Sequence, residues 1–153
     1  MMTTASKVIH ALQGKTLVTA ESLTGGGIGA ALTAVPGASN VYKGGVISYT
    51  DEVKREVLGV PSAYLKTFGA VSAPVAEGMA VGARDLLRAD IAVSVTGLAG
   101  PTGDEFGNEV GTVFIGYADC DGVTAGEYHF SGDREAVRNQ TIETVLDLIL
   151  KHA

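Results

Sequence analysis

The chain has 153 residues, of which 46% are hydrophobic and 18% are charged. This length allows one domain that buries roughly two thirds of the unfolded surface, and the composition is globular rather than disordered. Seventeen acidic and eleven scattered basic residues give a formal net charge of −6, which argues against a broad nucleic-acid surface.

The cysteine and histidine content argues against disulfides and metal centres. Cys120 is the only cysteine, so neither a disulfide framework nor a cysteine-rich zinc site is expected. His10, His129 and His152 lie far apart in the sequence, without the spacing of a metal motif. The sequence indicates neither a secretory signal nor a membrane span, since its first residues form no long apolar core and no run of about 20 apolar residues occurs. We therefore predict a cytoplasmic protein with no membrane segment.

The first part of the chain predicts alternating helices and strands. Gly14 and Pro36 are stop signals for the two helices, and Asp51 suits a helix N-terminus because an acid complements the helix dipole. The predicted elements are helix 3–12, strand 16–20, helix 25–35, strand 42–50 and helix 51–59.

The second part ends in a hairpin and a long helix. Pro74 suits the first turn of a helix, and Asp121–Gly122 is a hairpin signal between two strands. The predicted elements are helix 73–87, a central strand 89–97, strands 111–119 and 122–132, and helix 133–152. This order predicts one domain over residues 1–153, a three-layer α/β/α fold with a mixed sheet of about five strands.

The glycine-rich segment 25–30 follows a G-x-G-x-x-A pattern between a strand and a helix. It is a weak dinucleotide fingerprint, because no acid follows a second strand at the required spacing. Two other interpretations remain: small residues that pack the helix close to the sheet, or helix N–H groups that bind an anion with Ser22 and Thr24 as donors. Glu21 beside them would repel a phosphate.

A second glycine-rich loop, residues 97–111, follows the most apolar strand. It lacks the Gly-Lys-Ser/Thr ending of a P-loop, but ligands commonly bind at this position in α/β sheets. Thr96 and the backbone of residues 97–100 can donate hydrogen bonds to a ligand, or the segment is only a permissive turn. Arg134 and Arg138 share a helix face that is either solvated or able to hold a phosphate.

The segment Pro36–Lys54 contains Ser39, Tyr49 and Lys54 around one predicted strand. A lysine whose pKa is lowered by burial can take the proton of a serine hydroxyl, and serine–lysine pairs are known variants of the catalytic triad. Tyr49 can orient such a pair or pass a proton. The alternative is a loop serine, a strand tyrosine and a solvated lysine.

Several segments in order, covering nearly the whole chain, resemble the C-terminal domain of the competence/damage-inducible protein CinA and its stand-alone form, the nicotinamide-nucleotide amidohydrolases. They are TAESLTGG, PGASNVYKGGVISYTDEVK, GAVSAPVAEGMAVGA, VTGLAGPTG, VGTV and FSGDREAVRNQT.

The resemblance implies hydrolysis of the carboxamide of nicotinamide mononucleotide to nicotinate mononucleotide and ammonia, without a metal or organic cofactor. It places the catalytic serine, tyrosine and lysine at Ser39, Tyr49 and Lys54. The positive pyridinium ring would account for an acid, Glu21, beside the ligand. The implied substrate contacts are Glu21, Ser22, Thr24, Gly25, Gly26, Thr96, Gly97, Ala99, Gly100 and Arg138.

The sequence departs from the family pattern at Leu23, Ala38, Asp51, Asp104 and Glu109, and none of these departures removes the proposed catalytic residues. The resemblance also implies a homodimer that binds a small nucleotide as its substrate. Neither a nucleic acid nor a membrane is expected as a partner. A non-catalytic nucleotide- or protein-binding module is the alternative function, and a nucleotide-cofactor oxidoreductase is a third.

Overall fold

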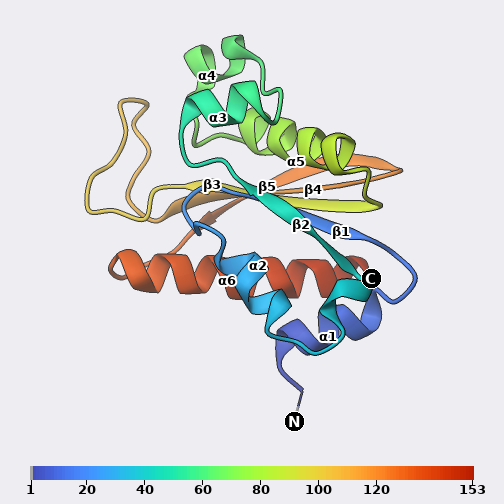
Figure 1. Ribbon diagram of the computed structural model, residues 1–153. Helices are drawn as coiled ribbons and strands as arrows, with labels where there is room; N and C mark the ends of the chain where they lie inside the picture. The colour runs from blue at the N-terminus through green and yellow to red at the C-terminus, as the bar shows by residue number, and fades with distance from the viewer. Residues whose placement is uncertain (1) are drawn as a thin grey trace.

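A computed structural model describes residues 2–153 as helices on both faces of one sheet (Figure 1). The elements in chain order are α1 (Thr4–Ala11), β1 (Leu17–Glu21), α2 (Gly27–Thr33), the 3-10 turn η1 (Ala38–Asn40), β2 (Tyr42–Ile47), α3 (Asp51–Glu56), α4 (Ser62–Phe68), α5 (Ala73–Leu87), β3 (Ile91–Gly97), β4 (Thr112–Asp119), β5 (Gly122–His129) and α6 (Arg134–His152).

The sheet has five strands in the order β2-β1-β3-β4-β5. Strands β2, β1 and β3 are parallel, whereas β4 and β5 are antiparallel additions joined by a hairpin. The predicted three-layer fold with a mixed sheet is confirmed. Because the carboxyl ends of parallel strands lie at one edge of a sheet, the segments after β1, β2 and β3 meet there.

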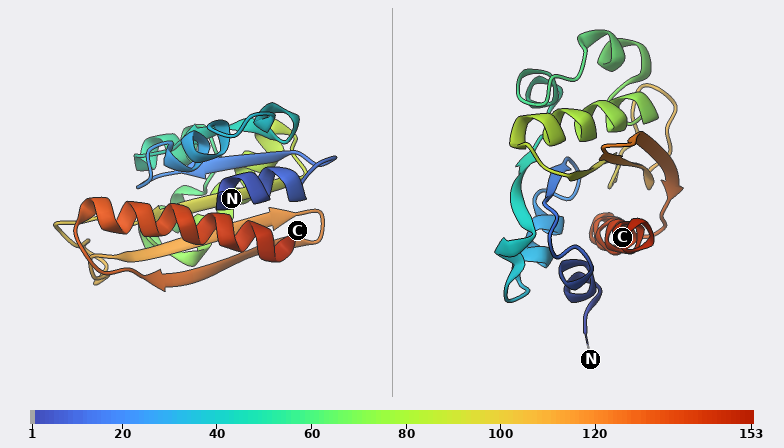
Figure 2. Two further views of the ribbon diagram at one scale, coloured as in Figure 1. Left: turned by 90° about the horizontal axis from the view of Figure 1, so that it is seen from below. Right: turned by 90° about the vertical axis from the view of Figure 1, so that its right-hand side faces the viewer.

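Two apolar clusters hold the helices to the sheet. On one face, α1, α2 and α6 pack against residues such as Leu17, Val93 and Ile115; on the other, α4, α5 and the segment after α3 pack against Val18 and Ala92 (Figure 2). Strands β1 and β3 are buried on both faces, as expected for central parallel strands.

The short helix α4 is absent from the sequence predictions. Its seven residues are too few to establish a helical period, and only Leu65 is buried, while Tyr64 and Phe68 are exposed. The strand predicted over 42–50 is also too long. It ends at Ile47 because Thr50 forms the N-cap of α3, where its hydroxyl accepts from the N–H of Val53 (3.4 Å).

Candidate active site

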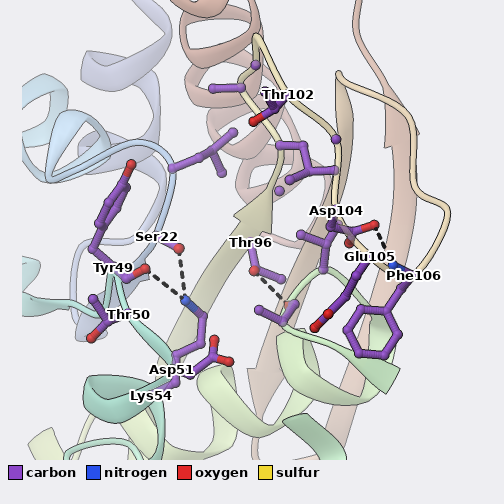
Figure 3. Close-up of a pocket in the computed structure, with 18 of the residues that line it drawn as sticks. Ser22, Tyr49, Thr50, Asp51, Lys54, Thr96, Thr102, Asp104, Glu105 and Phe106 are labelled. Atoms are coloured by element: carbon purple, nitrogen blue, oxygen red, sulfur yellow. Dashed lines mark hydrogen bonds between the residues drawn. The ribbon is translucent and has the colours of Figure 1, made fainter. Parts of the chain in front are cut away.

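A cavity of about 500 Å³ opens where the carboxyl ends of β1, β2 and β3 meet. Ser22 follows β1, Tyr49 follows β2, and Thr96 belongs to the last residues of β3. Lys54 reaches the cavity from the last turn of α3 (Figure 3). The size suits a small-molecule ligand. We call it the site cavity.

Lys54 is 1% exposed and is the largest of the fully buried side chains in residues 2–153. Its Nζ donates to Ser22 Oγ (2.9 Å), to the main-chain oxygen of Ser48 (2.8 Å) and to that of Tyr49 (3.5 Å). Burial lowers the pKa of Lys54 from 10.5 to about 8, partly opposed by the Asp51 carboxylate. A lysine with such a pKa can act as a general base near neutral pH.

The hydroxyl that Lys54 contacts belongs to Ser22. It lies directly after β1 and is held in place by its own N–H, which donates to the main-chain oxygen of Val95 in β3 (3.1 Å). The side chain is 7% exposed and lines the site cavity. The sequence prediction treated Ser22 as a substrate contact, whereas the structure makes it the serine of the serine–lysine pair.

Glu21 does not line the site cavity; its carboxylate holds the start of α2. It accepts hydrogen bonds from Thr24 Oγ1 (2.6 Å) and from the N–H groups of Ile28 (2.9 Å) and Gly29 (3.0 Å). The interpretation of this helix end as an anion site is therefore wrong, because a carboxylate of the chain itself already occupies its donors.

Four further predicted substrate contacts also lie outside the cavity lining. Thr24 is fully buried, and Gly25 and Gly26 have positive φ values of 57° and 98°, which glycine adopts without strain. Arg138 donates from Nε to the main-chain oxygen of Leu23 (2.9 Å) and from an Nη to that of Thr24 (3.2 Å). These residues support the β1–α2 turn from outside.

The predicted pair of Ser39 and Lys54 is not formed within the chain. Ser39 is exposed in η1, before β2, whereas Lys54 follows β2 (Figure 1). The strand spans residues 42–47, about 17 Å at the usual rise per residue. Ser39 lines a separate hollow together with Thr33 and Lys43. The prediction assumed that the chain folds back after β2, but α3 continues away from the η1 end.

Tyr49 lines the site cavity, but its hydroxyl is not directed at the serine–lysine pair. The side chain is 58% exposed, and Figure 3 shows its ring pointing away from Lys54. Its hydroxyl accepts from an Nη of Arg134 (3.0 Å). Only the main-chain oxygen of Tyr49 contacts Lys54, so the structure does not support a proton-passing role for the phenol.

The end of β3 and the second glycine-rich loop form another wall of the cavity, which Thr96, Gly97, Ala99 and Gly100 line. Thr96 Oγ1 donates to the main-chain oxygen of Ala70 (2.8 Å). This bond ties the end of β3 to the segment before α5 and leaves the oxygen able to accept from a ligand.

Asp104, one of the departures from the family pattern, organises the loop. Its Oδ1 accepts from the N–H groups of Phe106 (3.1 Å) and Asn108 (3.0 Å), and its Oδ2 accepts from Asn108 Nδ2 (2.8 Å). Asn108 Nδ2 also donates to the main-chain oxygen of Val71 (3.2 Å). Aspartate commonly stabilises turns in this way.

Four charged residues that were not predicted as site residues line the cavity: Asp51, Asp104, Glu105 and Arg134. Asp51 was predicted only as a helix start, and the loop containing Glu105 gives no periodicity from which to place it. Arg134 was noted with Arg138 on one helix face, but their spacing does not reveal which of the two faces the site.

Residues 2–153 contain neither a cluster of metal-ligating side chains nor a membrane-spanning helix. No group of three or more His, Cys, Asp or Glu side chains is arranged to hold a metal ion. In the same residues, no helix has the length and apolar character needed to cross a membrane.

Comparisons with known proteins agree with the fold and the sequence resemblance. The profile of the CinA C-terminal domain matches residues 2–153. A CinA-like protein of Geobacter metallireducens is 48% identical over 134 residues, which are 88% of this chain and 32% of that protein. One of Parasynechococcus marenigrum is 48% identical over 148 residues, 94% of this chain and 35% of that protein. The chain thus spans about a third of the length of these relatives.

Solved structures show the same architecture. The CinA superfamily protein of Klebsiella pneumoniae superimposes with a TM-score of 0.94 at 36% identity, covering 98% of this chain and 97% of that chain. The competence/damage-inducible protein CihA of Agrobacterium tumefaciens gives a TM-score of 0.93 at 39% identity, covering 97% and 92%. The chain therefore belongs to the CinA C-terminal domain family.

Proposed function

We propose that this protein is an amidohydrolase in which Ser22 is the nucleophile and Lys54 the general base. The observation that carries the proposal is the 2.9 Å contact between Lys54 Nζ and Ser22 Oγ inside a cavity. A serine hydroxyl needs a base to become a nucleophile, and a lysine serves when burial lowers its pKa. With a pKa of about 8, about one tenth of Lys54 is neutral at pH 7.

The reaction is a two-step acyl transfer. Neutral Lys54 takes the proton of Ser22, and the serine oxygen bonds to the amide carbon of the substrate. The C–N bond then breaks, the nitrogen takes the proton from Lys54 and leaves as ammonia, and the acyl group remains as a serine ester. Water hydrolyses this ester with Lys54 again as base, which restores Ser22 and releases a carboxylic acid.

The oxyanion of the intermediate needs hydrogen-bond donors close to the nucleophile. The N–H groups of Leu23 and Thr24 come next in the chain and, within residues 2–153, donate to no acceptor. Leu23 also lines the cavity. We assign the N–H of Leu23, the one of the two that lines the cavity, to the oxyanion; one such donor is typically worth a factor of about 10² to 10³ in rate.

The proposed substrate is nicotinamide mononucleotide, which the family resemblance suggests. The charges of the cavity support a substrate that carries both signs: Asp51, Asp104 and Glu105 are acidic, whereas Lys54 and Arg134 are basic. A pyridinium ring is cationic and a phosphate is anionic. The cavity volume of about 500 Å³ is in the range that takes a ligand of this size.

The test is ammonia release from nicotinamide mononucleotide by the wild type and three variants. We expect Ser22→Ala and Lys54→Met to lower kcat at least about 10³-fold, because each removes half of the nucleophile–base unit. Ser39→Ala is the matched control, the same substitution at an exposed serine, and should keep wild-type kcat. A wild-type rate in Ser22→Ala, or loss of activity in Ser39→Ala alone, would reject the assignment.

A non-catalytic module is the second candidate, because Lys54 is mostly protonated at neutral pH and can then bind an anionic ligand in the same cavity. Thermal stabilisation of the wild type by nicotinamide mononucleotide, together with no ammonia release between pH 6 and about pH 9, would favour this function. Turnover that Ser22→Ala abolishes would reject it.

A further inference from the structure

We propose that Arg134 binds the phosphate of the substrate and that Tyr49 positions its guanidinium. This inference rests on the proposed function, since it names how the same cavity recognises a nucleotide. It also replaces the sequence-based assignment of Arg138 as the substrate-binding arginine.

Arg134 is the basic residue that lines the site cavity in addition to Lys54, within residues 2–153. It is the first residue of α6, and its side chain reaches two walls of the cavity. One Nη donates to the main-chain oxygen of Gly100 in the glycine-rich loop (2.6 Å), and the other donates to the hydroxyl of Tyr49 after β2 (3.0 Å). The guanidinium therefore sits at the rim where β2, the loop and α6 converge.

The positive charge of Arg134 is not neutralised by an ion pair. In residues 2–153 no carboxylate lies within 4.0 Å of its guanidinium. The adjacent Asp133 is used as the N-cap of α6, accepting from the N–H of Ala136 (2.9 Å). The two partners of Arg134 are a carbonyl and a phenol. Of its five N–H donors three are left for a ligand, in the fork geometry that suits phosphate oxygens.

Arg138 cannot serve as the same site without giving up its present contacts. Both of its hydrogen bonds go to main-chain oxygens of the β1–α2 turn, and it does not line the site cavity. Apart from Lys54, the other charged groups of the cavity wall, Asp51, Asp104 and Glu105, are acidic and repel a phosphate. Arg134 is therefore the group best placed to attract one.

Tyr49 connects the base to the proposed phosphate group. Its main-chain oxygen accepts from Lys54 Nζ (3.5 Å), and its hydroxyl bonds Arg134 (3.0 Å). The length of one tyrosine thus separates the catalytic lysine from the guanidinium, and a pyridine ring with ribose and phosphate attached is at least that long. A nucleotide with its amide at Ser22 can therefore place its phosphate at Arg134.

The test compares two substrates that differ only in the phosphate, nicotinamide mononucleotide and nicotinamide riboside. We expect Arg134→Ala to lower kcat/KM for the mononucleotide about 10- to 100-fold, mainly through KM, because charge-assisted hydrogen bonds are lost. Its kcat/KM for the riboside should change less than about threefold. Tyr49→Phe should lower only the mononucleotide value, by about 2- to 10-fold, and Arg134→Lys should restore part of the loss.

Lys151→Ala is the matched control. It removes the same charge from the exposed C-terminal end of α6, about 26 Å along the helix from Arg134, and should leave both substrates unaffected. The proposal would be overturned if Arg134→Ala lowered kcat/KM for the two substrates equally, or lowered it for neither.

A binding experiment tests the inference even if the protein hydrolyses no amide. Ribose 5-phosphate should raise the melting temperature of the wild type and of Lys151→Ala, but not that of Arg134→Ala. Equal stabilisation of all three proteins, or of none, would reject a phosphate site at Arg134. Absent turnover with Arg134-dependent stabilisation would instead reject the amidohydrolase and keep the phosphate site.

Discussion

Lys54 illustrates how much chemistry one buried residue can bring to a small protein. Its burial is costly, because the charged ammonium loses its hydration and gains only a hydroxyl and two carbonyl oxygens as partners. The same burial lowers its pKa to about 8 and makes it useful as a base. The fold therefore sacrifices stability at this residue for reactivity toward Ser22.

This cost predicts a pH-dependent difference in stability between the wild type and Lys54→Met. The pKa of Lys54 is 10.5 in the unfolded chain and about 8 in the folded one. Between these values the unfolded state binds more protons, so wild-type stability rises with pH. The destabilisation that the buried Lys54 causes is fully present below pH 8 and disappears by about pH 10.5, a change of about 3 kcal/mol in the free energy of unfolding.

The measurement is urea unfolding of both proteins at intervals between pH 7 and about pH 10.5. We expect the free energy of unfolding of the wild type to gain about 3 kcal/mol relative to Lys54→Met across this range. The gain does not depend on how well methionine packs. The difference in free energy of unfolding between the wild type and Lys66→Met, at an exposed lysine of α4, should not change with pH. If the free energies of unfolding of all three proteins change equally with pH, the lowered pKa is contradicted.

At the scale of elements, α5 approaches its neighbours through two glycines one helical turn apart. A side chain at Gly82 would place its Cβ 1.8 Å from the main-chain oxygen of Leu58, whereas at Gly78 it would lie 3.5 Å from Val60, an ordinary contact. The backbone after α3 can pass this close to α5 only because position 82 has no side chain.

The two glycines give a matched pair of predictions. Alanine favours a helix over glycine by about 1 kcal/mol, so Gly78→Ala should raise the melting temperature. Gly82→Ala has the same helical benefit but forces the Leu58 carbonyl to move, and should destabilise the protein by about 1 to 3 kcal/mol. Thermal unfolding by circular dichroism compares them directly. Stabilisation by both substitutions would show that the Leu58 segment shifts freely.

At the scale of the whole molecule, the order of elements could be predicted because periodicity and turn residues are local signals. Strand 89–97 and helix 73–87 agree with β3 and α5 within a few residues. The cavity at the strand ends also follows from parallel topology. Long-range contacts could not be predicted: Lys54 meets Ser22, 32 residues away, rather than Ser39, which is nearer in sequence.

The arginines of α6 show the same limit. Arg134 and Arg138 are one turn apart on one face, so the sequence predicts equal access to a ligand. In the fold, the first reaches the cavity rim and the second reaches the main-chain oxygens of Leu23 and Thr24. Sequence spacing predicts the shared face, but the neighbours that each arginine meets depend on how α6 packs against the glycine-rich loop and the β1–α2 turn.

Arg138 joins the last helix to the turn that carries the nucleophile, across 115 residues of sequence. We expect Arg138→Ala to lower the free energy of unfolding by about 1 to 3 kcal/mol, because two carbonyl oxygens lose a charged donor. It should also lower kcat/KM for nicotinamide mononucleotide and for the riboside by the same factor, since the turn holding Ser22 loosens. Faster hydrogen exchange at residues 24–29 would locate the effect. Arg134→Ala is the comparison. If Arg138→Ala instead lowers kcat/KM only for the phosphorylated substrate, the phosphate-binding role belongs to Arg138 and not to Arg134.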